Sequence, residues 1–395
     1  MAVGACFPRG FEAGIASSGM KRSGKADLAL FASDRPASAA GVFTTNRVVA
    51  APVTVSRAQI QSGSARAIVT NSGSANACTG EAGRRDAWTM VHAAADALAL
   101  EPSQVLVAST GVIGVPLPID DVVTAIHAAA AGMAGTNGRQ AANAIRTTDA
   151  FPKLAHTQVE IGGATVRIGG VAKGAGMIRP DMATTLAHVT MDAGVPHATL
   201  RRVLRQAVAG SFNAISVDGC TSTNDCVFML ANGASGVAVE TGRRVRQLTA
   251  AVSELMLDLA KQVVRDGEGT TRVCTYTVTG AISGPEARAA ARGVAENVLV
   301  KCALHGGDPN WGRILAALGA AGVHVDPDRV AVAVGGVPIV FGGAGVLGSE
   351  ADARAALDRC EVEVAISLGL GGGSATVIAS DLSPDYVEFN SARTS

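Results

Sequence analysis

The sequence is poor in aromatic residues and has no excess of charge of either sign. Phe, Trp and Tyr make up 3% of the 395 residues, and 33 Lys and Arg residues are balanced by 33 Asp and Glu residues. A neutral chain lacks the broad positive potential that attracts nucleic acids and anionic membranes, and scarce aromatic side chains argue against base-stacking surfaces. We therefore expect neither a nucleic acid nor a membrane as a partner.

Cysteine pairs and long apolar runs are also missing. The cysteines number seven and no two of them have C-x-x-C spacing, which argues against a disulfide framework or a zinc site. No apolar run approaches the ~18 residues of a membrane helix, and the N-terminus lacks the apolar core of a signal peptide. We therefore expect a cytoplasmic protein without a bound metal.

Small and aliphatic residues are abundant instead, with 47 glycines and 48% hydrophobic residues. Runs rich in β-branched residues alternate irregularly with helical periodicity, and several runs are separated by turns and not by helices. This pattern predicts an α+β fold in which helices cover mixed sheets. The expected strands are 27–33, 51–56, 67–71, 104–109, 165–172, 184–191, 213–217, 227–231 and 272–278, and the expected helices are 83–99, 119–131, 198–209, 243–264, 285–295 and 350–357.

Gly, Ser and Pro cluster near residue 280, where the composition changes. At ~100–200 residues per domain the length suggests two domains, so we predict a main α+β body at 1–280 and a smaller C-terminal α/β domain at 281–395. Residues 343–348 have the G-x-G-x-x-G spacing of a dinucleotide site. The run before them, 330–341, contains two glycines and a proline and is predicted to be a hairpin, which argues against nucleotide binding.

The most informative segment is 169–193, where one strand is predicted to end at Lys173 and the next to begin at Thr184. The glycines between them permit a tight connection, and the small residue Ala183 precedes the threonine. The Thr184 hydroxyl could attack the Ala183 carbonyl, and hydrolysis of the resulting ester would free a new α-amine. That amine, with a pKa of about 7.7–8.0, can act as the base for its own hydroxyl. A glycine-rich hairpin is the alternative, and spacing alone favours it.

Three other motifs carry polar residues at predicted element ends. Thr110 and Gly111 follow a strand, where free backbone N–H groups could bind the oxyanion of a tetrahedral intermediate; an ordinary β-turn is the alternative. Thr147 lies in a Thr-Thr-Asp sequence, and Glu268 follows the long predicted helix. Both of the latter positions are typical of helix caps.

The remaining candidates have simpler explanations when taken alone. Asn390 and Ser395 lie in the last six residues, where a chain usually frays. His188 follows Thr184 in the same predicted strand and is expected to be a core histidine. Cys220 and Cys226 are expected to be small buried residues.

Several of these segments together resemble the ornithine acetyltransferase family, also called glutamate N-acetyltransferase. Residues 173–186 (KGAGMIRPDMATTL) are similar to the family's self-cleavage motif, and the similarity runs from residue 10 to the C-terminus. The other matching segments are 10–13 (GFEA), 42–46 (VFTTN), 71–80 (NSGSANACTG), 108–114 (ASTGVIG), 147–149 (TTD), 216–225 (SVDGCTSTND), 266–269 (DGEG) and 308–313 (DPNWGR).

The resemblance implies an N-terminal-nucleophile-like fold of the ornithine acetyltransferase and aminopeptidase type. It implies a precursor cut between Ala183 and Thr184 into an α chain (1–183) and a β chain (184–395), which form an α2β2 assembly. It further implies transfer of acetyl from N2-acetylornithine to glutamate, the recycling step of arginine biosynthesis. No metal or organic cofactor is expected.

The resemblance also implies residue roles. Thr184 is the nucleophile, and Thr110 with Gly111 forms the oxyanion hole. The substrate contacts are Thr147, Lys173, Thr184, Glu268, Asn390 and Ser395. Charge matching suggests that Lys173 pairs with the carboxylate of acetylornithine and Glu268 with its distal ammonium.

Four residues depart from the family pattern, namely Ser74, Thr185, Cys220 and Arg393. They leave open a secondary-metabolism acyltransferase paralogue. The shared fold leaves open an amidase or aminopeptidase, in which water takes the acyl group. The sequence also leaves open whether acetyl-CoA is a second donor. The ordered match of motifs favours transfer from acetylornithine to glutamate.

Overall fold

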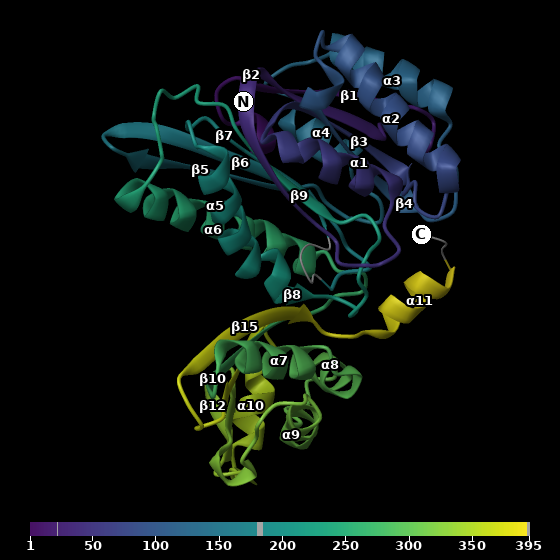
Figure 1. Cartoon of the computed structure of the whole chain (residues 1–395). Coiled ribbons are helices and arrows are strands. Elements are labelled where there is room, and N and C mark those ends of the chain that lie inside the picture. Colours follow the sequence, from purple (N-terminus) through teal and green to yellow (C-terminus); the bar gives the residue numbers. More distant parts are fainter. Residues whose placement is uncertain (22, 180–184, 393–395) are drawn as a thin grey trace.

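The computed structural model describes residues 1–21, 23–179 and 185–392. Within these ranges an eight-stranded mixed sheet forms the centre of the larger part of the molecule (Figure 1). Its strands run in the order β4-β3-β2-β9-β7-β6-β5, and β1 pairs with β2. The strands are β1 (Phe11–Ala16), β2 (Leu28–Phe43), β3 (Ser64–Ser74), β4 (Val105–Val112), β5 (Lys153–Ile161), β6 (Ala164–Lys173), β7 (Leu186–Met191) and β9 (Cys226–Ala231).

The long strand β2 joins two halves of this sheet. Its first residues pair with β1 and β3 and its last residues with β9, and its register with β3 shifts between Ala32 and Ala37. Ile68 of β3 and Phe228 of β9, from opposite halves, lie in one buried core. The two halves therefore face each other across that core, and this brings the ends of distant strands together.

Helices cover the outer faces of both halves. α1 (Ala51–Gln59), α2 (Gly80–Ala97) and α3 (Ile119–Ala131) share an apolar core with β2, β3 and β4. α5 (His197–Ala209) and α6 (Gly242–Arg265) share another with β5, β6, β7 and β9. The layers are thus helices, one half of the sheet, the other half and helices. α4 (Gly138–Ala144) contributes to the core between the two halves.

A second sheet with its own apolar core occupies the lower part of Figure 1. In the described chain it has seven strands in the order β13-β12-β11-β14-β10-β15-β8. Its strands are β8 (Ile215–Ser216), β10 (Val273–Ala281), β11 (Ala331–Val334), β12 (Val337–Phe341), β13 (Ala344–Gly345), β14 (Glu361–Ser367) and β15 (Gly373–Ser380). The helices of this part are α7 (Gly284–Ala295), α8 (Val298–His305), α9 (Trp311–Gly319) and α10 (Glu350–Ala356), and α11 (Pro384–Ala392) follows β15.

The predicted α+β class is confirmed, and so is the hairpin at 330–341, which forms β11 and β12. The strand predicted at 51–56 is wrong, because these residues begin α1. Pro52 lies in the first turn of α1, where its fixed φ suits a helix. Val55 is buried among the residues of α2 and α3, and this packing outweighs the preference of β-branched residues for strands.

The predicted division of the chain at residue 280 stays a prediction. Strand pairing places β8 and β10 in the second sheet, although both precede residue 282. No helix of the described ranges is long and apolar enough to cross a membrane. The same ranges hold no group of three or more acidic, His or Cys side chains placed to bind a metal ion.

Candidate active site

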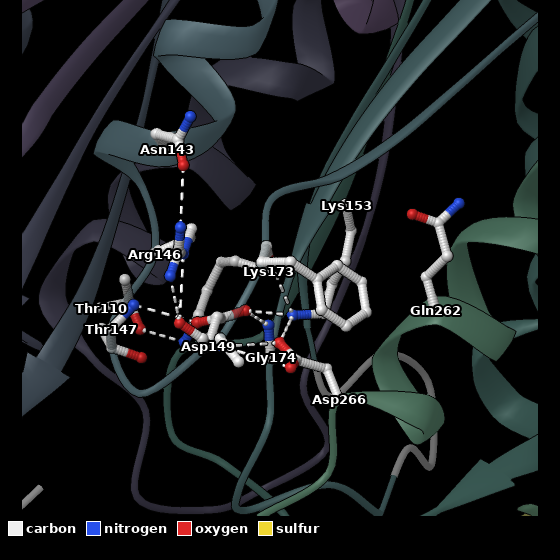
Figure 2. A network of polar contacts seen from close by, with 12 residues as sticks. Thr110, Asn143, Arg146, Thr147, Asp149, Lys153, Lys173, Gly174, Gln262 and Asp266 are labelled. Carbon is white, nitrogen blue, oxygen red and sulfur yellow. Dashed lines mark hydrogen bonds and ion pairs between the residues drawn. The ribbon is translucent and has the colours of Figure 1, made fainter.

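The ends of β4 and β6 meet, although four strands separate them in the order of the sheet. At the end of β6 the Lys173 ammonium donates a hydrogen bond to the Thr110 hydroxyl of β4, with 2.9 Å between Nζ and Oγ1 (Figure 2). Thr110 is buried and Lys173 is partly exposed. The contact exists because the two halves of the sheet face each other.

Gly111, next to Thr110, is a position that only glycine can occupy without strain. Its φ is +136°, and a Cβ there would lie 2.3 Å from the carbonyl carbon of Gly73 on β3. The register of β3 and β4 becomes irregular at Gly73 and Ser74, so regular pairing ends at this point. A hydroxyl and a closely approachable backbone therefore lie side by side, as an oxyanion site requires.

A buried cluster of charges lies at the end of β6 (Figure 2). The Asp149 carboxylate accepts hydrogen bonds from the Gly174 N–H at 2.7 Å, the Thr147 N–H at 2.9 Å and the Lys153 ammonium at 2.6 Å. Lys153 also pairs with Asp266, which follows α6. One carboxylate thus joins the loop at 147–149, the start of β5 and the end of β6.

Opposite charges in this cluster stabilise one another. Burial alone would raise the pKa of Asp149, but the nearby charges of Lys173 and Lys153 hold this pKa below its usual value. Burial raises the pKa of Asp266 despite its contact with Lys153. Burial lowers the pKa of Lys173, and Asp149 opposes that shift most strongly. Two lysines therefore face two carboxylates in a largely water-free space.

Glu268, two residues beyond Asp266, meets the C-terminal helix α11. Its backbone N–H donates to the carbonyl of Ala175 at 3.0 Å, and its carboxylate lies over Gly176, where a Cβ would be 2.5 Å from Oε2. The Asn390 amide of α11 donates to Glu268 Oε2 at 3.0 Å. The loop after Lys173 and the C-terminal helix therefore hold this carboxylate between them.

Two buried oxygens near the start of β7 have no hydrogen-bond partner among the described residues, namely Thr185 Oγ1 and Asp225 Oδ2. The two residues lie at the ends of neighbouring parallel strands, β7 and β9. Burial raises the pKa of Asp225 well above its usual value, and Lys173 opposes that shift. Unsatisfied buried polar atoms are costly, and these two lie beside the connection predicted to be cut.

Comparison with known proteins identifies the family of this chain. The sequence model described as the ArgJ family matches residues 12–395. The chain belongs to the ArgJ family. The arginine biosynthesis bifunctional protein ArgJ of Symbiobacterium thermophilum is 48% identical over 394 residues, which are 99% of this chain and 98% of that protein. The ArgJ of Geobacter sulfurreducens is 46% identical over 386 residues, with 97% and 98% covered.

A solved ArgJ structure supports the same assignment. The crystal structure of the arginine biosynthesis bifunctional protein ArgJ from Bacillus halodurans is 33% identical, with a TM-score of 0.50. The match covers 52% of this chain and 98% of the solved chain. The resemblance found in the motifs is thus confirmed at the level of the family and of its fold.

The structure gathers most of the predicted site residues of this ArgJ chain. Thr110 and Lys173 are in contact, and Asp149 binds the backbone of Thr147 and of the residue after Lys173. Glu268 is near enough to raise the pKa of Lys173 and binds Asn390. Ala183, Thr184 and Ser395 lie outside the described residues, and the roles of all the site residues stay predictions.

Sequence reasoning missed Lys153 of the ArgJ site and gave Asp149 and Asp266 only capping roles. The sequence does contain a signal for the contact between Asp149 and Lys153, because these residues are four positions apart and opposite in charge. Their burial, at 0% exposure of both side chains, depends on the long-range approach of α6. Spacing along the chain does not reveal that approach.

His188 is a core histidine, as expected. Its Nε2 lies 2.9 Å from the Thr70 hydroxyl, and its ring stacks on Phe228 at 5.6 Å between centroids. Burial lowers its pKa to about 4, so the ring is neutral at physiological pH. His188 thus links β3 to β7 through the core of the ArgJ fold.

Proposed function

We propose that this chain is an acetyltransferase of arginine biosynthesis that moves the acetyl group of N2-acetylornithine to glutamate. The observation that carries the proposal is the hydrogen bond from Lys173 to Thr110 beside Gly111, next to the connection with the predicted nucleophile. Relatives that match nearly the whole chain are named for arginine biosynthesis, which supports these substrates.

The proposed reaction has two halves that share Thr184. In the first, the Thr184 hydroxyl attacks the acetyl carbonyl and passes its proton to its own α-amine. Thr110 and Gly111 donate to the oxyanion of the tetrahedral intermediate. The C–N bond then breaks, the ornithine amine leaves with a proton, and acetyl stays on Thr184 as an ester. In the second half the glutamate amine attacks that ester, and the Thr184 oxygen leaves and regains a proton.

The nucleophile becomes available when the chain cuts itself between Ala183 and Thr184. This part of the proposal is supported by β6 and β7, which pair Lys173 with Leu186 and so hold both ends of the connection close together. It is also supported by the solved Bacillus halodurans chain, which matches 52% of this chain over 98% of its own length. A chain of that size is what a cut near the middle would leave.

Substrate binding in this proposal follows charge. A carboxylate at Glu268 suits the distal ammonium of ornithine. Glutamate would place a carboxylate there instead, at a cost of about 1–4 kcal/mol for unit charges ~4 Å apart. Asn390 can offset this cost by turning one N–H of its amide, which donates to Glu268 and to the carbonyl of Tyr386, to the substrate carboxylate. The assigned contacts are Thr147, Lys173, Thr184, Glu268, Asn390 and Ser395.

The proposal extends to a second donor and to an assembly. The relatives are named bifunctional, so we include acetyl-CoA as an alternative source of the acetyl group. We also include an α2β2 assembly of the two self-cleaved chains in the cytoplasm. Each of these points has its own measurement, namely activity with acetyl-CoA and glutamate, the mass in solution, and cell fractionation.

The deciding experiment follows the acetyl group. We expect intact mass to show two fragments divided at Ala183 and Thr184, and acetylornithine alone to add about 42 Da, one acetyl, to the 184–395 fragment. Glutamate should then remove that mass and yield N-acetylglutamate. Initial rates with both substrates should give parallel double-reciprocal lines.

A hydrolase would behave differently in the same experiment. Ornithine release at an undiminished rate without glutamate would show that water takes the acetyl group. Intersecting lines without the added mass would contradict an ester on Thr184. Either result would overturn the proposed transfer.

A further inference from the structure

The direction of the hydrogen bond between Lys173 and Thr110 follows from the groups involved. An ammonium has three N–H donors and no lone pair, so it can only donate. The Thr110 hydroxyl must therefore be the acceptor in the 2.9 Å contact. Its own O–H can then donate to another acceptor. Within residues 1–21, 23–179 and 185–392 the Thr110 hydroxyl has no hydrogen bond in which it is the donor.

The backbone next to Lys173 is held by the buried carboxylate of Asp149. The backbone N–H of the next residue, Gly174, donates to Asp149 at 2.7 Å. Asp149 is itself held by Lys153, and Lys153 is held by Asp266. Lys153 and Asp149 have fully buried side chains. The end of β6 is thus anchored to a rigid buried cluster on one side and touches Thr110 on the other.

From this arrangement we propose that Lys173 is a positioning residue that turns the Thr110 hydroxyl outward as an oxyanion donor, and that Asp149 holds Lys173 in place for that task. The inference rests on the proposed acetyl transfer and adds a role beyond the pairing of Lys173 with a substrate carboxylate. Lys173 uses one N–H to position the Thr110 hydroxyl, so its other two N–H groups remain for the substrate carboxylate.

The Thr110 hydroxyl is oriented in this way only while Lys173 is protonated. A neutral amine has a lone pair, so the Thr110 hydroxyl could donate to Nζ and no longer to the oxyanion. Asp149, Asp225 and Glu268 face the ammonium and raise its pKa, whereas burial and Lys153 lower it. Lys21, whose Nζ binds two backbone carbonyls, is a further cation nearby.

A double-mutant cycle tests the proposal on the full-length, self-processed protein. Lys173→Met, Thr110→Val and the double variant are compared with the unchanged chain, and Lys261→Met of α6 serves as a matched loss of a lysine outside the cluster. We expect Thr110→Val and Lys173→Met each to lower kcat by about 10²–10³-fold. The double variant should be no more than a few-fold worse than either single variant, because both remove one donor.

A purely substrate-binding lysine would give another pattern. Lys173→Met would then raise KM for acetylornithine at nearly unchanged kcat, and the two losses in kcat/KM would multiply in the double variant. That result would overturn the positioning role while leaving the acetyl transfer itself intact. Absence of transfer by the unchanged chain would overturn the proposed function instead.

Asp149→Asn gives a second measurement that keeps both Lys173 and Thr110. Without the carboxylate the pKa of Lys173 falls, so the loss of kcat at high pH should begin at lower pH than in the unchanged chain. The loss at low pH, set by the Thr184 amine, should stay in place. If the Lys173 and Thr110 variants remain uncut, this pH profile decides. An unmoved high-pH limb would contradict the proposal.

Discussion

The two sheets of this molecule differ in what they bury. Among the buried polar and charged side chains of the described residues, those beyond residue 280 are Lys301, Ser380, Asp381 and Ser383. The first sheet buries many more, including Asn71, Ser109, Thr110, Asp149 and Lys153. Both sheets are covered by helices and have continuous apolar cores. Size and covering therefore do not distinguish them.

The difference lies in how the strands end. In the first sheet, β2 carries the chain from one half to the other, so that β4 and β6 approach end to end. Polar groups at those ends are buried by the facing half and bind one another. The second sheet has no facing half within the described chain, and its smaller set of buried polar groups gathers at the end of β15, where Ser380 binds Lys301 and Asp381 binds Thr271. The larger buried polar cluster of the first sheet therefore depends on its two halves facing each other.

The largest effect should come from replacing the hydroxyl of Thr184, in the part of the chain that forms the first sheet. We expect Thr184→Ala to leave one uncut chain without acetyl transfer, because both the cleaving group and the nucleophile are lost. The matched control is Thr376→Ala in the second sheet, where the hydroxyl is exposed and binds Thr277. The control should be cut and active. Two fragments from Thr184→Ala would contradict Thr184 as the cleaving group.

The next prediction compares how much folding stability is lost when each of two buried lysines is replaced. Lys153→Met should lower the free energy of unfolding by about 3–5 kcal/mol, because Asp149 and Asp266 lose their shared cation. Lys301→Met should cost about 1–3 kcal/mol, because the groups it leaves are a neutral carbonyl and hydroxyl of Ser380. Denaturant unfolding measures both. Equal losses would show that the charged cluster is not specially sensitive.

Two glycines sharpen the comparison further. Gly336, in the turn between β11 and β12, has a φ of +86° and open space where a Cβ would lie, whereas at Gly111 the backbone of β3 is in the way. Gly336→Ala should cost about 1–2 kcal/mol of stability and leave activity unchanged. Gly111→Ala should also lower kcat by more than about tenfold, since the oxyanion site must shift. Steady-state kinetics separate the two outcomes.

The smallest effect concerns the C-terminal helix. Asn390→Ala removes an exposed amide from Glu268, and we expect about 0.5–1.5 kcal/mol of lost substrate binding. KM should rise by up to about tenfold, more for glutamate than for acetylornithine, because only glutamate needs the amide donor beside Glu268. A larger rise for acetylornithine would reverse our assignment of the amide.

Local patterns explain what the sequence can predict. The bounds of α6 follow almost to the residue from apolar positions that recur at spacings of three and four, and those residues are buried. Thr110, Lys173 and Glu268 stand out in motifs at element ends. The sequence of α1 favours a strand because its helix depends on packing against α2 and α3. The link from Lys173 to Thr110 needs the fold of β2, which no local pattern encodes.

The order of strands around β7 has a consequence for the cut protein. β7 and β9 would belong to the 184–395 fragment, yet they lie between β2 and β6 of the 1–183 fragment. The two polypeptides would interlock within one sheet, so neither can leave without breaking it. Melting would then become a dissociation whose midpoint rises with protein concentration. Refolding of the cut protein would require two fragments to associate, so dilution would slow it. The uncut chain would refold in a unimolecular reaction that does not depend on concentration.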